Sequence, residues 1–208
     1  MYEDNLLAGK GLKLLFFAEL LLAVSVVLAG LLKSGLELAA LILSLVGLHR
    51  TVTSHPLFRR AFHLTIAQPV IYILAALLTA LGRQQLRVAS IFAMLFSVAI
   101  LVLQFYIVYL VCMAAGELLT AGGFDAEAAR GRTAWKFCLA DTEISLLSVA
   151  LLILPALMPS IAPWLMWSEG ATGLMLTLTL VMGIVRLAYF IIYLMFLYHA
   201  YLALLSGD

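Results

Sequence analysis

The chain has few of the residues that charged, thiol or metal chemistry requires. Only 11% of its 208 residues are charged, and the formal net charge is +1. Such a chain lacks the basic surface with which proteins bind nucleic acid, so we expect no nucleic-acid partner. The only cysteines, Cys112 and Cys138, are far apart and form no CxxC motif. This spacing argues against a disulfide framework and against a thiolate zinc site.

Histidines and catalytic motifs are also scarce. The four histidines are His49, His55, His63 and His199. Membrane di-iron centres need dense histidine clusters because each metal takes several ligands at once. The chain contains no P-loop and no GxGxxG, HExxH or GxSxG motif. We therefore expect no metal and no cofactor, and an enzymatic activity is not favoured.

Apolar residues dominate what remains. Hydrophobic residues make up 65% of the chain, and the mean hydropathy of +1.15 lies far above that of soluble domains. Long apolar runs, most of them near or above the ~20 residues that cross a bilayer, follow one another through short links that leave no room for a soluble domain. The sequence therefore predicts one all-α membrane domain of six transmembrane helices, at about residues 12–32, 35–53, 56–81, 88–118, 137–161 and 172–203.

Helix-start signals place two of the predicted links. Ser34 and Glu37 have the S-x-x-E spacing of a capping box, which predicts a tight turn before the second helix. Ser54 followed by Pro56 predicts the start of the third helix, with a capping oxygen and then a residue that has no N–H to lose. Asp125 resembles an N-cap for a polar turn that leads into the fifth helix.

The distribution of basic residues predicts the orientation. Six spans place both termini on one side of the membrane. That side has eight Lys and Arg residues, whereas the opposite links have three. The eight are Lys10, Lys13, Arg50, Arg59, Arg60, Arg130, Arg132 and Lys136, and the three are Lys33, Arg83 and Arg87. The positive-inside rule then predicts cytoplasmic termini, and the short loops favour a multi-pass protein of a bacterial inner membrane.

One charge interrupts the last apolar run. Arg186 lies roughly 9 Å from the predicted cytoplasmic boundary, at ~1.5 Å per residue. A charge at this depth needs a partner or a wet cavity, and we expect Glu19 to approach Arg186. The side chains predicted near the same level are Glu19, Gln68 and Gln104, with Asp141 and Glu143 just below.

This polar layer has two interpretations. It can be structural, with a Glu19–Arg186 ion pair and the two glutamines fixing the order of helix packing. It can instead line a cytoplasm-facing pocket that binds a solute, a proton or a lipid headgroup. The carboxylates of Asp141 and Glu143 point in roughly opposite directions on a helix, so they make a poor acid–base pair.

A second group lies near the predicted cytoplasmic surface and consists of His55, Arg59, Arg60 and His63. These side chains are suited to contact with lipid headgroups. The leading hypothesis is a small transport, channel or solute-binding component that uses the polar layer. The alternatives are a membrane enzyme that grips a lipid or isoprenoid phosphate through the second group, and a non-catalytic assembly or regulatory subunit. The expected partners are the lipid bilayer and either a partner subunit or further copies of this chain.

Overall fold

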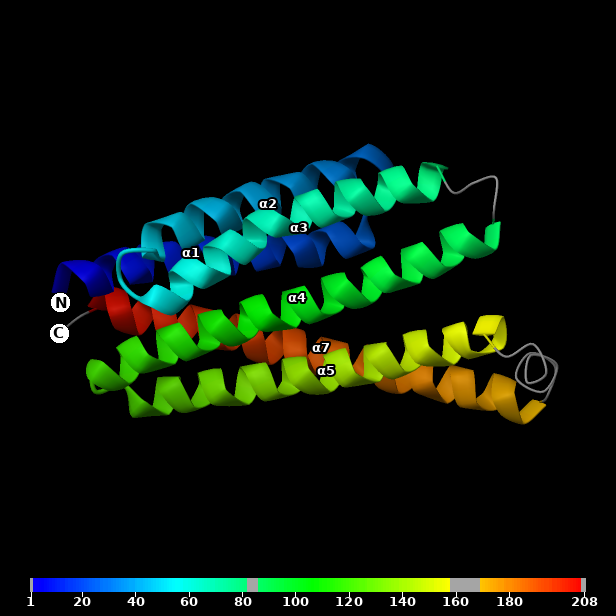
Figure 1. Cartoon of the computed structure of the whole chain (residues 1–208). Helices are drawn as coiled ribbons and strands as arrows, with labels where there is room; N and C mark the ends of the chain where they lie inside the picture. The colour runs from blue at the N-terminus through cyan, green and yellow to red at the C-terminus, as the bar shows by residue number, and fades with distance from the viewer. Residues whose placement is uncertain (1, 82–85, 158–168, 207–208) are drawn as a thin grey trace. The chain divides into compact units, whose positions relative to one another are not determined.

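The structure, a computed structural model, describes residues 2–81, 86–157 and 169–206. These residues form six α-helices and no strand (Figure 1), which confirms the predicted all-α class. The helices are α1 (Tyr2–Val27), α2 (Gly30–Thr51), α3 (Pro56–Leu81), α4 (Leu86–Ala121), α5 (Asp125–Leu157) and α7 (Glu169–Ser206).

The predicted helix boundaries agree with the structure for α3 but not for the start of α5. The third predicted helix coincides with α3 at both ends. In contrast, α5 begins at Asp125 and continues without interruption, so the polar turn predicted before residue 137 belongs to the same helix. Its first turns are rich in Ala, Glu and Arg, which are strong helix formers whether or not they are apolar. Arg83 and residues 158–161 of the predicted fifth span lie outside the described residues.

The prediction of a capping box before the second helix was wrong. Helix α1 ends at Val27 and α2 begins at Gly30, so Ser34 and Glu37 lie inside α2. Gly30 has a φ of +64°, a left-handed conformation that residues with a Cβ rarely adopt. The chain therefore breaks at the glycine, and Glu37 instead pairs with Lys33 one turn earlier, at 3.8 Å between Nζ and Oε1.

The start of α3 agrees with the prediction in position. Pro56 is the first helical residue, as predicted. The backbone N–H of Leu57 donates to Nδ1 of His55 at 3.3 Å, so the imidazole also caps this helix start, and the capping role of Ser54 stays a prediction.

The turn between α4 and α5 closes with a Schellman motif. The Phe124 N–H donates to the Leu119 carbonyl at 2.8 Å, and the Gly123 N–H donates to the Thr120 carbonyl at 3.1 Å. Gly123 has the left-handed φ of +82° that this motif requires. The motif reverses the chain within three residues and sets α4 and α5 antiparallel.

The chain divides into two compact units. Unit 1 comprises Met1–Ile66, Tyr106–Lys136 and Phe190–Asp208, and unit 2 comprises Ala67–Phe105 and Phe137–Tyr189. Unit 1 therefore contains α1, α2 and parts of four other helices, whereas unit 2 contains the remaining parts of α3, α4, α5 and α7.

In unit 1, α1 and α2 approach each other backbone to backbone. A Cβ added at Gly11 would lie 2.5 Å from the Gly47 carbonyl oxygen, and a Cβ at Gly47 would lie 2.8 Å from the Gly11 carbonyl oxygen. Real Cβ atoms do not approach so closely, so both positions need glycine for this contact. Small residues at a helix crossing are typical of helices that pack within membranes.

Other close contacts join the remaining helices of unit 1. Gly131 of α5 packs against the ring of Phe196 of α7, where an added Cβ would lie 2.8 Å from Cε2. The ring centroid of Phe16 in α1 lies 5.8 Å from those of Tyr198 and Tyr201 in α7. The two ends of the chain thus lie at the same end of unit 1 (Figure 1).

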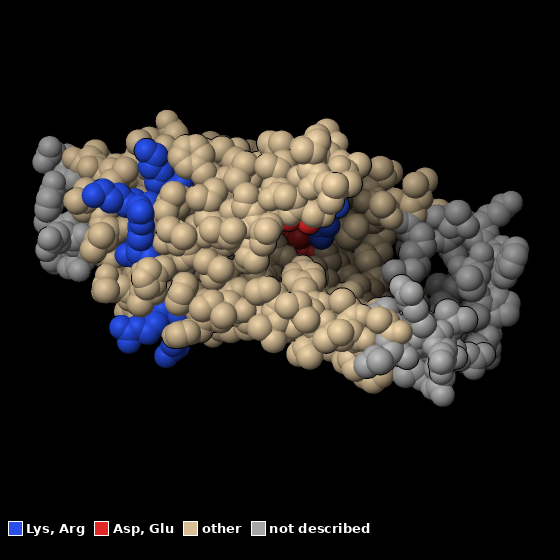
Figure 2. All heavy atoms as spheres, turned by 90° about the horizontal axis from the view of Figure 1, so that it is seen from above, with Lys and Arg blue, Asp and Glu red and all other residues tan. Residues whose placement is uncertain are grey.

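Most basic residues of unit 1 lie toward this same end, whereas Lys33 lies in the first turns of α2. On the face shown in Figure 2, most Lys and Arg side chains lie together there. Arg59 and Arg60 are exposed in the first turn of α3, and Arg130 and Arg132 are exposed in the first turns of α5. The predicted grouping of these four arginines near the chain termini agrees with this arrangement.

Among the described helices, four are long and apolar enough to cross a membrane. The qualifying segments are Gly30–Thr51, Pro56–Leu78, Phe92–Ala121 and Leu176–Ser206. Their surfaces carry many exposed large apolar side chains, among them Leu31, Leu176 and Ile184. Such surfaces are unfavourable in water and favourable in lipid. The protein is therefore a helical bundle with the properties of a membrane-spanning protein.

Candidate functional site

Arg186 of α7 contacts two polar residues of α5 within unit 2. Its Nε donates to Oδ1 of Asp141 at 3.3 Å, and its Nη2 donates to Oγ of Ser145 at 3.2 Å. Asp141 and Ser145 are four residues apart, so they present their side chains on the same face of α5. One charge of the apolar α7 segment is thus matched by a carboxylate and a hydroxyl from its neighbour.

The two charged partners differ in burial. The Asp141 side chain is 12% exposed, whereas the Arg186 side chain is 54% exposed. A guanidinium has five N–H donors, of which these two contacts use two. The other N–H groups have no partner among the described residues of unit 2. The geometry thus pairs a buried anion with a cation that retains hydrogen-bonding capacity.

Polar side chains continue along α5 for another turn. Ser148 Oγ donates to the Ile144 carbonyl at 2.9 Å and lies 4.0 Å from Met182 Sδ of α7. Met182 is four residues before Arg186, so the contacts follow the antiparallel register of α5 and α7. This register places the Arg186 contacts in a continuous polar seam rather than at an isolated crossing.

The predicted polar layer is only partly tested by these contacts. Arg186 lies in the seam, and Asp141, which the sequence placed just below the layer, is its partner. Gln68 is half-buried and Gln104 is exposed, and neither makes a hydrogen bond to Arg186 among the described residues of unit 2. Glu19 is half-buried in unit 1, so its pairing with Arg186 stays a prediction.

His55 forms a different polar contact, in unit 1. Its Nε2 lies 2.9 Å from Oε2 of Glu117 in α4. Because Nδ1 already accepts the Leu57 N–H, the proton must be on Nε2, which donates to the carboxylate. The contact is therefore a hydrogen bond from a histidine to a carboxylate. Both ring nitrogens are engaged, which leaves His55 no lone pair for acid–base chemistry.

The other predicted headgroup contacts remain on the surface. Arg59, Arg60 and His63 are exposed on the first turns of α3, and His63 has its ring 5.8 Å from that of Phe62. The structure brings these three residues onto one helix end, separate from the contact that His55 makes with Glu117.

A cavity of about 410 Å³ opens between α4 and α5 in unit 1. It lies beside the Glu117 carboxylate that His55 holds. Its lining residues are Cys112, Met113, Gly116, Glu117, Thr120, Ala121, Ala128 and Arg132. We call this cavity the α4–α5 groove. Glu117 and the groove were not predicted from the sequence, because only the antiparallel packing of the two helices brings these residues together.

No protein-family model, curated protein or solved structure matches the chain. Across the described residues, no group of three or more His, Cys, Asp or Glu side chains is placed to hold a metal ion. The features that bear on function are therefore the Arg186–Asp141 contact, the His55–Glu117 contact and the α4–α5 groove.

Proposed function

We propose that the protein crosses the membrane six times with both termini in the cytoplasm, as a component of a bacterial inner membrane. Two observations support this topology. Both termini lie at one end of unit 1, and the side predicted to be cytoplasmic has eight Lys and Arg residues, whereas the opposite links have three. Helices α1 and α5 have 26 and 33 residues, which is enough to cross a bilayer despite their charged side chains.

Within this topology the protein acts as a small solute-binding or transport component. The observation that carries this proposal is the half-exposed Arg186 in an apolar helix, with its buried partner Asp141. A charge inside a membrane is costly, and such residues are typically paired or line a solute path. Ion pairing with Asp141 removes part of the cost, and the remaining N–H donors favour a ligand that carries acceptor oxygens.

The distribution of burial favours binding over a purely structural pair. A pair that served only to fix helix packing is most stable when both partners have all their hydrogen bonds satisfied. Here the carboxylate is enclosed and the guanidinium is open. Ser145 orients the guanidinium from the same face of α5, leaving its other edge available to a ligand.

The alternative of a lipid-processing enzyme is less favoured, because both ring nitrogens of His55 are engaged. The alternative of an assembly subunit makes a different prediction from solute binding. In an assembly subunit, the Arg186–Asp141 pair can be replaced by a neutral pair without loss of function.

Native mass spectrometry of the full-length protein, extracted from its host membrane, tests the proposal. We expect wild type to retain a small-molecule adduct, and we expect Arg186→Gln combined with Asp141→Asn to lose it. The combined variant keeps the site neutral and close in shape, so loss of the adduct is not caused by an unpaired buried charge. Arg59→Gln, which removes an exposed arginine of unit 1, is the matched control and should retain the adduct.

Two results would contradict solute binding. One is an adduct that survives in the combined variant. The other is a wild-type protein that carries no small molecule and instead co-purifies with a partner subunit, which would support the assembly role.

A further inference from the structure

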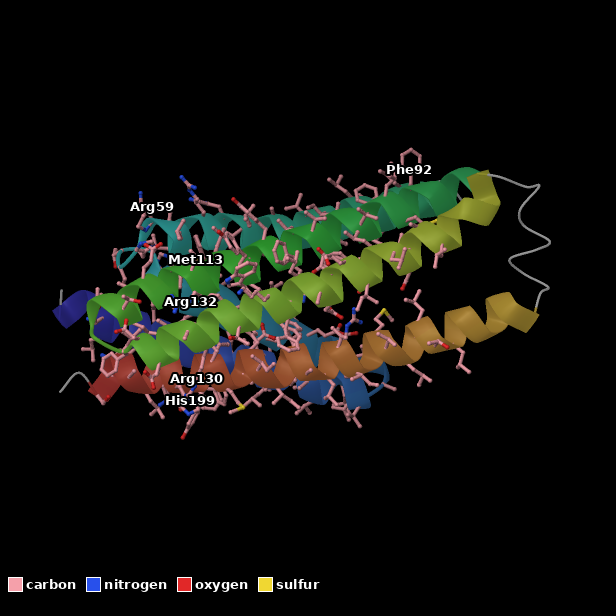
Figure 3. The ribbon with its side chains drawn as sticks, turned by 90° about the horizontal axis from the view of Figure 1, so that it is seen from below. Arg59, Phe92, Met113, Arg130, Arg132 and His199 are labelled. Atoms are coloured by element: carbon pink, nitrogen blue, oxygen red, sulfur yellow. The ribbon has the colours of Figure 1, made fainter. Side chains whose placement is uncertain are left out.

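The α4–α5 groove lies in unit 1, near the helix ends that carry the chain termini. Small residues keep it open, because Gly116, Ala121 and Ala128 have no long side chain to fill it. Figure 3 shows Met113 of α4 and Arg132 of α5 on these two helices, with Arg59 apart from them at the edge of the ribbon.

Two close approaches set the register of the helices across the groove. A Cβ added at Gly116 would lie 3.9 Å from the Ala128 carbonyl oxygen, and one at Gly131 would lie 3.3 Å from the Cys112 carbonyl oxygen. Arg132 is therefore level with Cys112. Glu117 is five residues nearer the helix ends, which corresponds to roughly 7 Å at ~1.5 Å per residue.

The groove thus presents different chemical groups at increasing distance from the helix ends. A carboxylate, Glu117, lies nearest the helix ends. Its Oε2 is held by His55, which leaves Oε1 to accept from a second donor. The Arg132 side chain leaves α5 at the level of Cys112. Helical side chains tilt toward the N-terminus of their own helix, so the guanidinium reaches back toward the helix ends, whereas the thioether of Met113 and the buried Cys112 on α4 tilt the other way and provide an apolar inner part.

We propose that this groove binds a zwitterionic glycerophospholipid with a primary-amine headgroup, phosphatidylethanolamine, from the leaflet on the side of the termini. In that leaflet the ammonium is outermost, the phosphate follows, and the acyl chains are deepest. This is the order of Glu117, Arg132 and the apolar inner part. The ammonium donates to the oriented carboxylate, the guanidinium binds the phosphate, and an acyl chain packs along Met113.

The charge pattern discriminates among phospholipids. Phosphatidylglycerol offers the phosphate for Arg132 but no cation for Glu117, so the Glu117 carboxylate stays without a cation beside the lipid. Phosphatidylcholine has a cation without N–H donors, so it cannot hydrogen-bond to Oε1. Both lipids should therefore bind less tightly than phosphatidylethanolamine. This proposal needs the membrane topology but does not involve Arg186.

The experiment measures how much of each defined lipid the full-length, delipidated protein retains in native mass spectra, with phosphatidylethanolamine, phosphatidylglycerol and phosphatidylcholine titrated separately. We expect wild type to bind phosphatidylethanolamine about tenfold more tightly than phosphatidylglycerol, as one charge-assisted hydrogen bond provides. Glu117→Gln should remove this preference while binding to phosphatidylglycerol is maintained. Arg132→Gln should weaken binding of all three lipids, and Arg130→Gln, which removes an exposed arginine of α5 that does not line the groove, should change nothing.

Three results would overturn the proposal. Equal binding of the three lipids by wild type does so without any variant, and therefore does not depend on variant folding. Equal losses in Arg132→Gln and Arg130→Gln would indicate a diffuse basic surface. Displacement of the lipid by soluble phosphoethanolamine at equal concentration would show that the acyl chain contributes nothing and that the ligand is a free headgroup. None of these results bears on the solute adduct expected at Arg186.

Discussion

The two units bury different kinds of side chain. In unit 1 the buried residues are almost all apolar, with Phe58, Phe196 and Leu12 among the largest that are fully enclosed. In unit 2 the buried side chains among the described residues are mostly polar, namely Asp141, Thr142 and Ser145, together with Cys138 and Tyr189. In lipid, helices associate through close packing and hydrogen bonds rather than through exclusion of water. Unit 1 illustrates close packing, and unit 2 illustrates hydrogen bonding.

The polar contact of each unit extends this comparison. In the His55–Glu117 contact the histidine is the less exposed partner, at 18% against 55%. In the Arg186–Asp141 contact the less exposed partner is the carboxylate, at 12%. A carboxylate that is more than half exposed, such as Glu117, tolerates the loss of its partner, whereas a buried carboxylate that loses its cation must protonate or remain charged at a high cost. The same kind of deletion should therefore have unequal effects in the two units.

The largest effect is expected from Arg186→Gln, which leaves Asp141 buried without a cation. We expect a loss of about 3 kcal/mol in the free energy of unfolding, at the low end for buried ion pairs because the guanidinium is half-exposed. Thermal unfolding in detergent measures it. Adding Asp141→Asn should restore most of the loss, and a double variant as unstable as the single one would contradict the explanation.

The packing of unit 1 should show the next largest effect. Gly11→Ala places a methyl group against the Gly47 carbonyl and should cost about 2 kcal/mol, as overpacking typically does. The matched control in unit 2 is Gly183→Ala, because a Cβ there meets nothing within 4 Å. It should be neutral or stabilise α7 by about 0.5–1 kcal/mol. Equal unfolding temperatures for the two variants would show that backbone contact is not what distinguishes unit 1.

His55→Ala removes both a helix cap and the hydrogen bond to Glu117. We expect a destabilisation of about 1 kcal/mol, close to that of losing an N-cap, because the carboxylate left behind is more than half exposed. Denaturant unfolding measures it, with His63→Ala as the exposed-histidine control. A loss as large as that of Arg186→Gln would remove the contrast between the two polar contacts.

The smallest effect is expected from Lys33→Ala in α2. Its contact with Glu37 is long, at 3.8 Å, and both side chains are about half exposed. Pairs of this kind contribute about 0.3–0.5 kcal/mol or less. Unfolding temperatures that match wild type within error are the expected result, and a clear decrease would mean that charge pairs matter in unit 1 as well.

Among the described residues, the number and order of the helices could be predicted from the sequence, because apolar runs of this length have one structural solution in a membrane. The boundaries were less accurate where two signals competed. At Ser34–Glu37 a side-chain pattern indicated a helix start, but the left-handed φ of Gly30 determined it. At residues 125–136 low hydrophobicity placed the start of the fifth span at residue 137, whereas the helix begins at Asp125, the predicted N-cap, because helix propensity depends on backbone and rotamer freedom and not on polarity.

The candidate site was predictable only in its cation. Arg186 is conspicuous as a single charge in an apolar run, but sequence alone cannot show which of several carboxylates at a similar depth faces it. The choice of Asp141 depends on the rotation of α5 about its axis, which side-chain packing sets. The proximity of Glu117 and Arg132 was not predictable from the sequence, because it arises from the antiparallel register that follows the Gly123 turn.

The glycine contact between α1 and α2 has a consequence for how the chain is made. Only Leu28 and Ala29 join these helices, and both helices are synthesised before α3. Local contacts of this kind form quickly, and chains begin to fold from the N-terminus during translation. The first hairpin can therefore close before α3 leaves the ribosome, giving the later helices a finished surface on which to assemble.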